Sequence, residues 1–201
     1  MALRRRPAAF LSSATLVLAA LAGAPIAGAQ QPTPPAAQPP AAQAAPPAAN
    51  PADVQSVDAI LGALYDVISG AAGQKRDWNR FNSLFHPGAR LIPSGPRQAG
   101  GFAARAITPQ EYAERSGPML ERDGFFETEI ARTTERFGHV VHVFSTYESR
   151  RAASDPTPFM RGINSIQLFD DGTRWWVMSV FWQQESAQDP IPAKYLPGGS
   201  R

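Results

Sequence analysis

The chain has 201 residues, 43% of them hydrophobic and 18% charged, a length that suits one domain with appendages. It contains no cysteine, which excludes disulfide scaffolds, thiolate metal sites and cysteine nucleophiles. The formal net charge is +2, but three of the 19 basic residues are Arg4, Arg5 and Arg6, and without them 16 basic residues stand against 17 acidic ones. The charge therefore gives no reason to expect a nucleic-acid partner.

The first 29 residues have the pattern of an export signal. The three arginines precede an apolar run over residues 8 to 24, and Ala27-Gly28-Ala29 forms a small-x-small cleavage site before Gln30. The run is marginal for a membrane span, which needs about 20 apolar residues. We expect cleavage after Ala29 rather than retention as an anchor, and a periplasmic or secreted protein without membrane contact after cleavage.

Residues 30–51 are rich in proline and alanine, with eight of each. This composition cannot form a core and favours polyproline II, so we predict a disordered spacer. The folded domain is then expected over residues 52–188, followed by a C-terminal tail over residues 189–201.

A first helix is predicted to begin at Asn50-Pro51-Ala52-Asp53, which offers a cap residue, a proline at the first helical position and an acid in the first turn. Gly70 and Gly73 end it. Its buried face carries apolar residues at spacings of three and four, namely Val57, Ile60, Leu61, Leu64, Tyr65 and Ile68.

Two more helices follow. Residues 77–85 predict a short helix with Trp78 and Phe81 inward, which ends at His86-Pro87-Gly88. The capping box Thr108-Pro109-Gln110-Glu111 predicts another helix that extends to about Arg122.

After Gly124 the hydrophobic period changes to two, which indicates strands. Short strands are expected over residues 89–93 and 102–107, and Asp170-Asp171-Gly172 predicts a hairpin turn. This order of elements predicts an α+β fold in which a curved antiparallel sheet wraps on three N-terminal helices. The four long strands are expected over residues 125–137, 139–150, 159–169 and 174–185.

The last strand is apolar on both faces if its residues alternate strictly from Trp175 to Trp182. One face of the strand can pack against the helices. The other face would expose apolar side chains to water unless another surface packs on it. We expect a homodimer formed through the sheet.

Three features occur together: a first helix with a buried tyrosine, the segment Trp78-Asn79-Arg80-Phe81-Asn82-Ser83-Leu84-Phe85-His86-Pro87-Gly88-Ala89-Arg90-Leu91, and the segment Asp171-Gly172-Thr173-Arg174-Trp175-Trp176-Val177. Over residues 52–186 the chain thus resembles the nuclear transport factor 2-like superfamily, in its SnoaL-like and ketosteroid-isomerase-like branch. The resemblance implies a cone-shaped half-barrel with a pocket between sheet and helices. It leaves function open, because the superfamily contains isomerases, dehydratases, cyclases, epoxide hydrolases and proteins that only bind or dimerise.

In the isomerase branch a tyrosine of the first helix donates to an oxyanion, and an aspartate of the first strand abstracts the proton. Tyr65 stands at the matching helical position. The position of the base falls at about Pro93, and no carboxylate occurs between Asp77 and Glu111. That mechanism lacks its base unless Glu127 or Glu129 supplies it from another strand. The alternative for Tyr65 is a core tyrosine with a satisfied hydroxyl.

Of the three histidines, His142 is the best candidate for acid-base chemistry, because it lies in the middle of a strand. The alternative is a histidine on the sheet surface or in a dimer contact. His139 and His142 are three apart and face opposite sides of a strand, so they cannot bind one metal ion. We expect neither a metal nor a cofactor.

Polar side chains on the long strands offer a second set of site residues. Glu127 and Glu129 share one face of their strand. If that face is concave, Glu129 and Arg161 are expected to pair and to orient an anionic or carbonyl ligand. If it is convex, they belong to a polar dimer surface. Only one of the two groups lines the pocket, either the group of Glu129 and Arg161 or His142.

Two functions remain from the sequence. The first is an exported protein that binds a small hydrophobic molecule, or serves as a dimeric accessory module. Its pocket is predicted to be lined by Tyr65, Trp78 and Phe81, with polar groups from Glu129 and Arg161 or from His142. The alternative is a SnoaL-like or isomerase-like enzyme acting on a hydrophobic, carbonyl-bearing substrate, with Tyr65 or His142 as its acid-base group.

Overall fold

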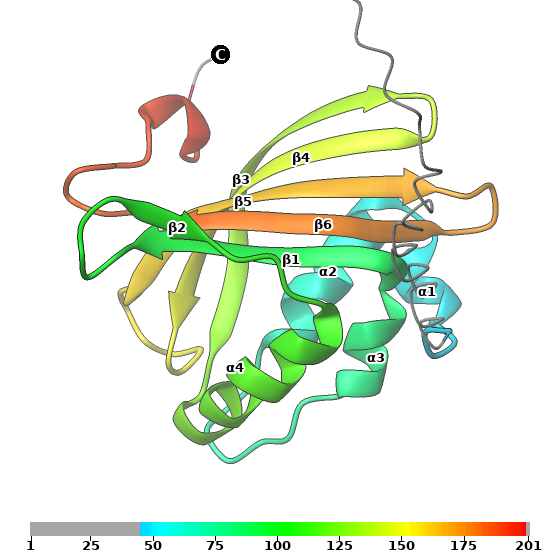
Figure 1. Ribbon diagram of the computed structural model, residues 1–201, viewed down its shortest axis with the longest axis horizontal. Helices are drawn as coiled ribbons and strands as arrows, with labels where there is room; N and C mark the ends of the chain where they lie inside the picture. The colour runs from blue at the N-terminus through cyan, green and yellow to red at the C-terminus, as the bar shows by residue number, and fades with distance from the viewer. Residues whose placement is uncertain (1–44, 200–201) are drawn as a thin grey trace, which may run out of the picture. The chain divides into compact units, whose positions relative to one another are not determined.

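The computed structural model describes residues 45–199 (Figure 1). The predicted signal peptide and most of the Pro/Ala-rich segment lie outside the described residues. Within the described range, no helix has the length and apolar character needed to cross a membrane.

The predicted first helix is two helices, α1 (Pro51–Val54) and α2 (Val57–Ile68). As expected, Asn50 caps the first one, and its side-chain oxygen accepts a bond from the Ala52 amide. The expectation of one continuous helix is wrong at Ser56, whose backbone is extended and whose hydroxyl accepts a bond from the Ala59 amide at 3.0 Å. Serine competes in this way with helical backbone bonds and starts a new helix.

The second predicted helix is shorter than expected, and the strand after it is longer. Helix α3 spans Trp78–Ser83 with Asp77 as its cap, and β1 spans Phe85–Pro96. The predicted stop at residues 86–88 is instead an irregular part of β1, where the pairing register shifts. Strand β2 (Phe102–Ala104) follows. Helix α4 (Pro109–Asp123) begins with the predicted capping box.

The four long strands are β3 (Phe126–Phe137), β4 (Val140–Arg150), β5 (Met160–Asp170) and β6 (Trp175–Gln184). The strand order β2-β1-β6-β5-β4-β3 gives one six-stranded sheet, and the α+β class is confirmed. The sheet is mixed rather than wholly antiparallel, because β1 lies parallel to β6. No hairpin links these two strands, so nothing local forces them into opposite directions.

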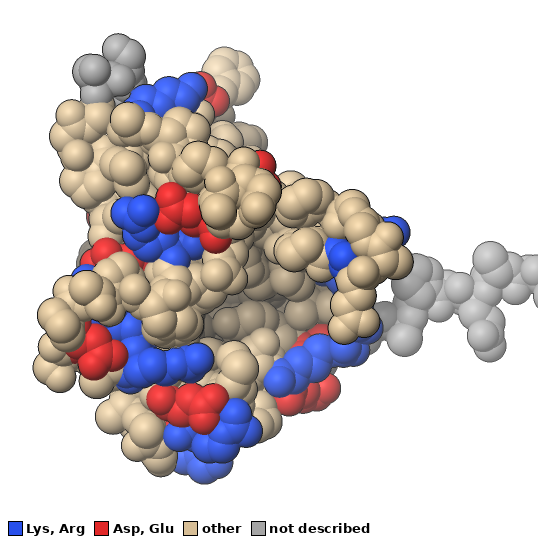
Figure 2. All heavy atoms as spheres, turned by 90° about the vertical axis from the view of Figure 1, so that its left-hand side faces the viewer, with Lys and Arg blue, Asp and Glu red and all other residues tan. Residues whose placement is uncertain are grey.

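The sheet curves over the helices, which all lie on its concave side (Figure 1). The C-terminal segment, with the short helix η1 (Ala193–Tyr195), lies on the other side of the sheet (Figure 1). There the Thr146 hydroxyl donates to the Tyr195 carbonyl at 2.6 Å, and the rings of Phe144 and Tyr195 are 4.9 Å apart. Acidic and basic side chains are interspersed on the surface that Figure 2 shows.

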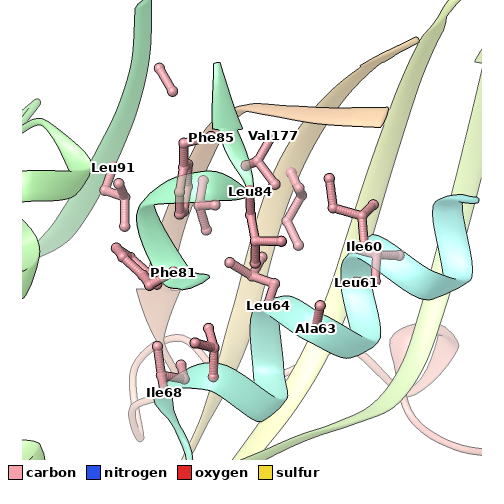
Figure 3. Packing of buried hydrophobic residues seen from close by; sticks show 14 of the residues in the cluster. Ile60, Leu61, Ala63, Leu64, Ile68, Phe81, Leu84, Phe85, Leu91 and Val177 are labelled. Carbon is pink, nitrogen blue, oxygen red and sulfur yellow. The ribbon is translucent and has the colours of Figure 1, made fainter. Parts of the chain in front are cut away.

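The hydrophobic core joins the helices to the concave face of the sheet (Figure 3). Ile60 and Leu61 on α2, Phe81 on α3 and Val177 on β6 are all 2% exposed or less. Burying a side chain of this size contributes roughly 1.5–3 kcal/mol. The apolar stripe read from the sequence of α2 is therefore the face that holds the helix to the sheet.

Two bulges decide which strand residues share a face. In β6 the pairing skips Met178, so Val180 and Trp182 join Val177 on the concave face and Phe181 turns outward. In β3 the pairing skips Ile130. Strict alternation along the last strand is therefore the wrong expectation, because one extra residue exchanges the faces of all that follow.

Candidate functional site

A cavity of about 210 Å³ lies between the helices and the concave face of the sheet. It is smaller than the roughly 300–1,000 Å³ typical of pockets for drug-sized ligands, so it suits a compact molecule. Its aromatic lining residues are Tyr65, Phe81, Tyr112, Phe125, Tyr147 and Trp182. Its aliphatic and sulfur-containing ones are Leu64, Ile68, Leu91, Met119, Leu120, Met160 and Val180. Its other polar ones are Ser116, Glu127 and Asn164.

One side of the molecule is hollowed near its centre (Figure 2). Uncharged residues form the floor of this hollow, and charged side chains of both signs lie along its rim (Figure 2).

A chain of hydrogen bonds leads from the cavity wall to the protein surface. The hydroxyls of Tyr65 on α2 and Ser145 on β4 are 2.7 Å apart, and the Ser145 hydroxyl donates to a carboxylate oxygen of Glu129 on β3. The other Glu129 oxygen pairs with the Arg132 guanidinium at 2.6 Å. This ion pair keeps Glu129 an acceptor.

The donors and acceptors in this series of hydrogen bonds all run in one direction. Ser145 has a single hydroxyl proton and gives it to Glu129, so Tyr65 must donate its own proton to Ser145. The Tyr65 oxygen in turn accepts a bond from the Asn164 side-chain amide at 3.1 Å. The Tyr65 hydroxyl is thus committed to protein partners, which does not fit a role as donor to a ligand oxygen.

Glu127, the acidic side chain of the cavity wall, is held by two neutral donors. Ser149 donates to one carboxylate oxygen at 3.0 Å, and Asn164 donates to the other at 3.4 Å. Desolvation outweighs these two bonds and raises the pKa of Glu127 to about 7. Among the described lining residues there is no Lys, Arg or His. Glu127 therefore changes its charge near neutral pH without a cation beside it.

Three polar atoms of the cavity wall are free to meet a ligand. Within residues 45–199, the hydroxyls of Tyr112 and Tyr147 and the side-chain carbonyl oxygen of Asn164 have no hydrogen-bond partner, and no fully buried polar atom lacks one. These three atoms are therefore not fully buried, and all three residues line the cavity. Burial raises the pKa of both tyrosines well above the ordinary range, so their hydroxyls stay protonated at neutral pH.

Of the apolar site residues predicted from the sequence, Tyr65 and Phe81 line the cavity and Trp78 does not. Trp78 faces α4 instead, where its indole N–H donates to Glu121 at 3.1 Å and its ring lies against Gly117. A short helix between two neighbours buries aromatic groups on both sides, and sequence spacing alone does not say which side meets the cavity.

Of the predicted polar residues, His142 and Arg161 lie on the convex face of the sheet, outside the cavity. The Nε2 atom of His142 is 3.0 Å from the Ser165 hydroxyl, and Arg161 pairs with Glu185 at 2.9 Å. The expected pairing of Glu129 with Arg161 is therefore wrong. The reason is register: Arg161 lies opposite Glu148, whose side chain also points outward.

Glu129 lies at the edge of the site rather than on the cavity wall. It belongs to a shallow surface groove between α2 and β3, which Tyr65 and Glu127 also line. Of the two carboxylates left open as substitutes for a missing base, Glu127 is the one that reaches the cavity.

Sequence reasoning did not assign a role to Asn164 or Tyr112. The sequence of β5 does indicate that Asn164 points inward. Asn164, Ile166 and Leu168 are two residues apart, so they share one face of the strand, and Ile166 and Leu168 are at most 1% exposed. Tyr112 follows the capping box of α4 by one residue, where its inward direction depends on how the helix sits on the sheet. In the described part of the chain, no group of three or more acidic, histidine or cysteine side chains could hold a metal ion.

No protein-family model matches the chain, and no curated protein matches it in sequence. Several solved structures are similar to it at low sequence identity. A protein of unknown function with a cystatin-like fold from Nostoc punctiforme is 12% identical, with 66% of this chain and 91% of that chain covered and a TM-score of 0.48. An NTF2-like protein of unknown function from Shewanella baltica is 12% identical, with coverage of 64% and 90% and a TM-score of 0.41.

A further NTF2-like protein of unknown function, from Methylobacillus flagellatus, is 13% identical, with coverage of 65% and 95% and a TM-score of 0.38. The curved six-stranded sheet over the helices has the arrangement that the resemblance led us to expect. These likenesses concern the fold alone.

Proposed function

We propose that this domain binds a compact, largely apolar molecule in the cavity between its helices and its sheet. The observation that carries the proposal is an aromatic-lined cavity whose wall presents Glu127 and an accessible Asn164 carbonyl oxygen. Apolar walls supply most of the affinity of such sites, and a few polar groups orient the ligand. The polar group of the ligand then lies against Glu127 and Asn164.

Calorimetric titration with benzyl alcohol and cyclohexanol, both small enough for the cavity, tests this proposal. We expect saturable binding to the native chain and its loss in Ser116→Phe, which fills the cavity from α4. Ser116→Ala removes the same hydroxyl without filling the space and should bind as the native chain does. Absence of saturable binding by both alcohols and by the amines of the same shape, or equal binding by the two variants, contradicts the proposal.

A second candidate is an enzyme that moves a proton on a carbonyl-bearing substrate. It is favoured by Glu127, because a pKa of about 7 suits a general base near neutral pH. The Tyr65 hydroxyl is engaged with Ser145, so the donor to the substrate oxygen in this scheme is Tyr112 or Tyr147.

Deuterium exchange into the methyl group of acetophenone, followed by NMR in D₂O, tests this second candidate without knowledge of the natural substrate. Catalysed exchange by the native chain that disappears in Glu127→Gln supports it. Exchange at the rate of buffer alone counts against it.

Export and dimerisation belong to the same proposal. The signal pattern of residues 1–29 supports a mature chain that begins at Gln30, which the intact mass of the native protein tests. Phe181, 45% exposed on the convex face near Phe144 and Ile163, supports a dimer contact there.

A further inference from the structure

We infer that the ligand of the cavity is a small organic cation, whose ammonium group pairs with Glu127 inside a ring of aromatic side chains. The inference rests on the proposed binding function and names the chemical class of its ligand.

The Glu127 carboxyl group has a hydrogen-bond donor at each oxygen but no basic partner on the described cavity wall. Each of its oxygens accepts a hydrogen bond from a neutral donor, Ser149 on one side and Asn164 on the other. Both bonds favour the carboxylate, because a carboxylate only accepts. No basic side chain is found among the described residues of the cavity wall, so the carboxylate has no counter-ion of its own. A carboxylate shielded from water is costly unless it is paired, and a cationic ligand supplies the missing charge.

Aromatic side chains make up much of the cavity lining. Six aromatic residues surround the cavity, and three of them form a continuous wall. The rings of Phe81 and Tyr112 are stacked with centroids 5.5 Å apart, and Tyr112 meets the edge of Trp182 at 6.2 Å. The faces of aromatic rings attract cations, and most strongly where water is excluded. Rings and carboxylate therefore favour the same charge.

The hydrogen-bonding groups beside Glu127 also restrict the chemistry of the ligand. The Asn164 carbonyl oxygen and the Glu127 carboxylate are both acceptors, so the ligand must donate to both. An ammonium group has several N–H donors and meets this demand. A carboxylate or phosphate ligand would face Glu127 without any positive partner, and a ketone could accept only from the Tyr112 and Tyr147 hydroxyls and would leave Glu127 unpaired.

The surrounding charges point the same way. The groove outside Glu127 has more carboxylates than basic groups. The titratable and charged side chains that face Glu127 from the elements around it are Asp58, Tyr65 and Asp66 on α2, Tyr112 on α4, Glu129 and Arg132 on β3, and Tyr147 on β4. The tyrosines stay neutral. Arg132 pairs with Asp58 and Glu129, and Arg80 of α3 pairs with Asp66, so three carboxylates stand against two arginines and the remaining charge favours a cation.

The test compares two amines with the alcohols of the same shape: benzylamine with benzyl alcohol, and cyclohexylamine with cyclohexanol. Each probe is titrated calorimetrically into the native chain at pH 6 and pH 8. We expect the amines to bind more tightly than the alcohols at pH 8. The affinity for the amines should rise about tenfold from pH 6 to pH 8, because the ionised fraction of Glu127 rises about tenfold around a pKa of about 7. The affinity for the alcohols should hardly change.

Glu127→Gln keeps the shape of the side chain and removes its charge. It should weaken amine binding about tenfold or more, the usual loss for a charged hydrogen bond, and abolish the dependence on pH. Glu135→Gln, on the same strand and 81% exposed, removes the same charge outside the site and should leave amine binding unchanged.

The outcomes separate the two proposals. If the alcohols bind and the amines bind no better, or if Glu127→Gln leaves amine affinity unchanged, the cation inference is overturned while the cavity remains a binding site. If neither amines nor alcohols bind, both the cation inference and the proposed binding function are overturned.

Discussion

The hydroxyl of Tyr65 on α2 donates to the hydroxyl of Ser145 on β4, 80 positions further along the chain, at a distance of 2.7 Å. This bond is the centre of the series from Asn164 through Tyr65 and Ser145 to Glu129. It holds the first long helix against the sheet and fixes the orientation of the Asn164 amide beside Glu127. The arrangement favours the interpretation of Tyr65 as a core tyrosine with a satisfied hydroxyl.

Tyr65→Phe removes only that hydroxyl. It leaves the Ser145 hydroxyl and one N–H of Asn164 without their buried partner, so we expect the free energy of unfolding to fall by about 1–3 kcal/mol. Urea unfolding measures the change. Tyr112→Phe is the matched control, because the Tyr112 hydroxyl has no partner within the described chain, and it should cost less than about 0.5 kcal/mol. Equal costs for the two variants would contradict the directed chain of bonds.

Glu127 should make the domain less stable as the pH rises. The pKa of Glu127 is about 7 in the folded domain, against about 4.3 for an exposed glutamate. Between these values the folded domain holds a proton that the unfolded chain has released, so stability decreases from about pH 4 to pH 7. At pH 8 the loss is on the order of 3–4 kcal/mol.

Glu127→Gln has no charge at any pH. It should be more stable than the native chain at pH 8 by that amount, with the difference vanishing near pH 4. Urea unfolding of both proteins at pH 5 and pH 8 tests the expectation, with the exposed Glu135→Gln as control. A difference that is the same at both values of pH would show that Glu127 is not desolvated in the folded domain.

Arg76 ties the end of α2 to the end of α4. It is 7% exposed, and its guanidinium donates to the carbonyl oxygens of Ile68 at 2.9 Å, Gly70 at 2.7 Å and Leu120 at 3.1 Å. Arg76→Met leaves these carbonyls without that donor, so we expect a loss of stability on the order of 3–5 kcal/mol in thermal or urea unfolding.

The neighbouring Lys75 serves as the control for Arg76. Its side chain is 88% exposed and pairs with Glu121 at the surface. Lys75→Met should cost less than about 1 kcal/mol. If the two variants lose the same stability, the carbonyl contacts of Arg76 do not support the helix ends as described.

Phe181 provides a test of the dimer. It lies on the convex face of β6 and is 45% exposed. If the dimer forms there, Phe181→Glu should give a monomer, because a charge buried in an apolar contact costs several kcal/mol. Phe137→Glu makes the same change at a ring that is 90% exposed at the end of β3, and should remain dimeric. Light scattering at micromolar concentration measures the mass, and a monomeric native chain would rule the dimer out.

Local chemistry in the sequence determined most of the elements. The Asn50 cap, the Thr108 capping box and the Asp171-Gly172 turn act within a few residues of themselves, and α1, α4 and β6 begin close to the expected positions. The apolar stripe of α2 identified its buried face, because its residues are only three or four positions apart in the sequence. With the resemblance of residues 52–186, these signals were enough to predict the α+β class and a cone-shaped half-barrel.

Only the tertiary structure decided which polar side chains meet in the cavity. Period two assigns residues to the faces of a single strand, but strand pairing decides which faces coincide, and it put Asn164 inside and Arg161 outside. The bulges at Ile130 and Met178 then reversed the faces of the residues after them. The pKa of Glu127 likewise depends on desolvation by α2, α4 and the sheet together, which no single segment of the sequence contains.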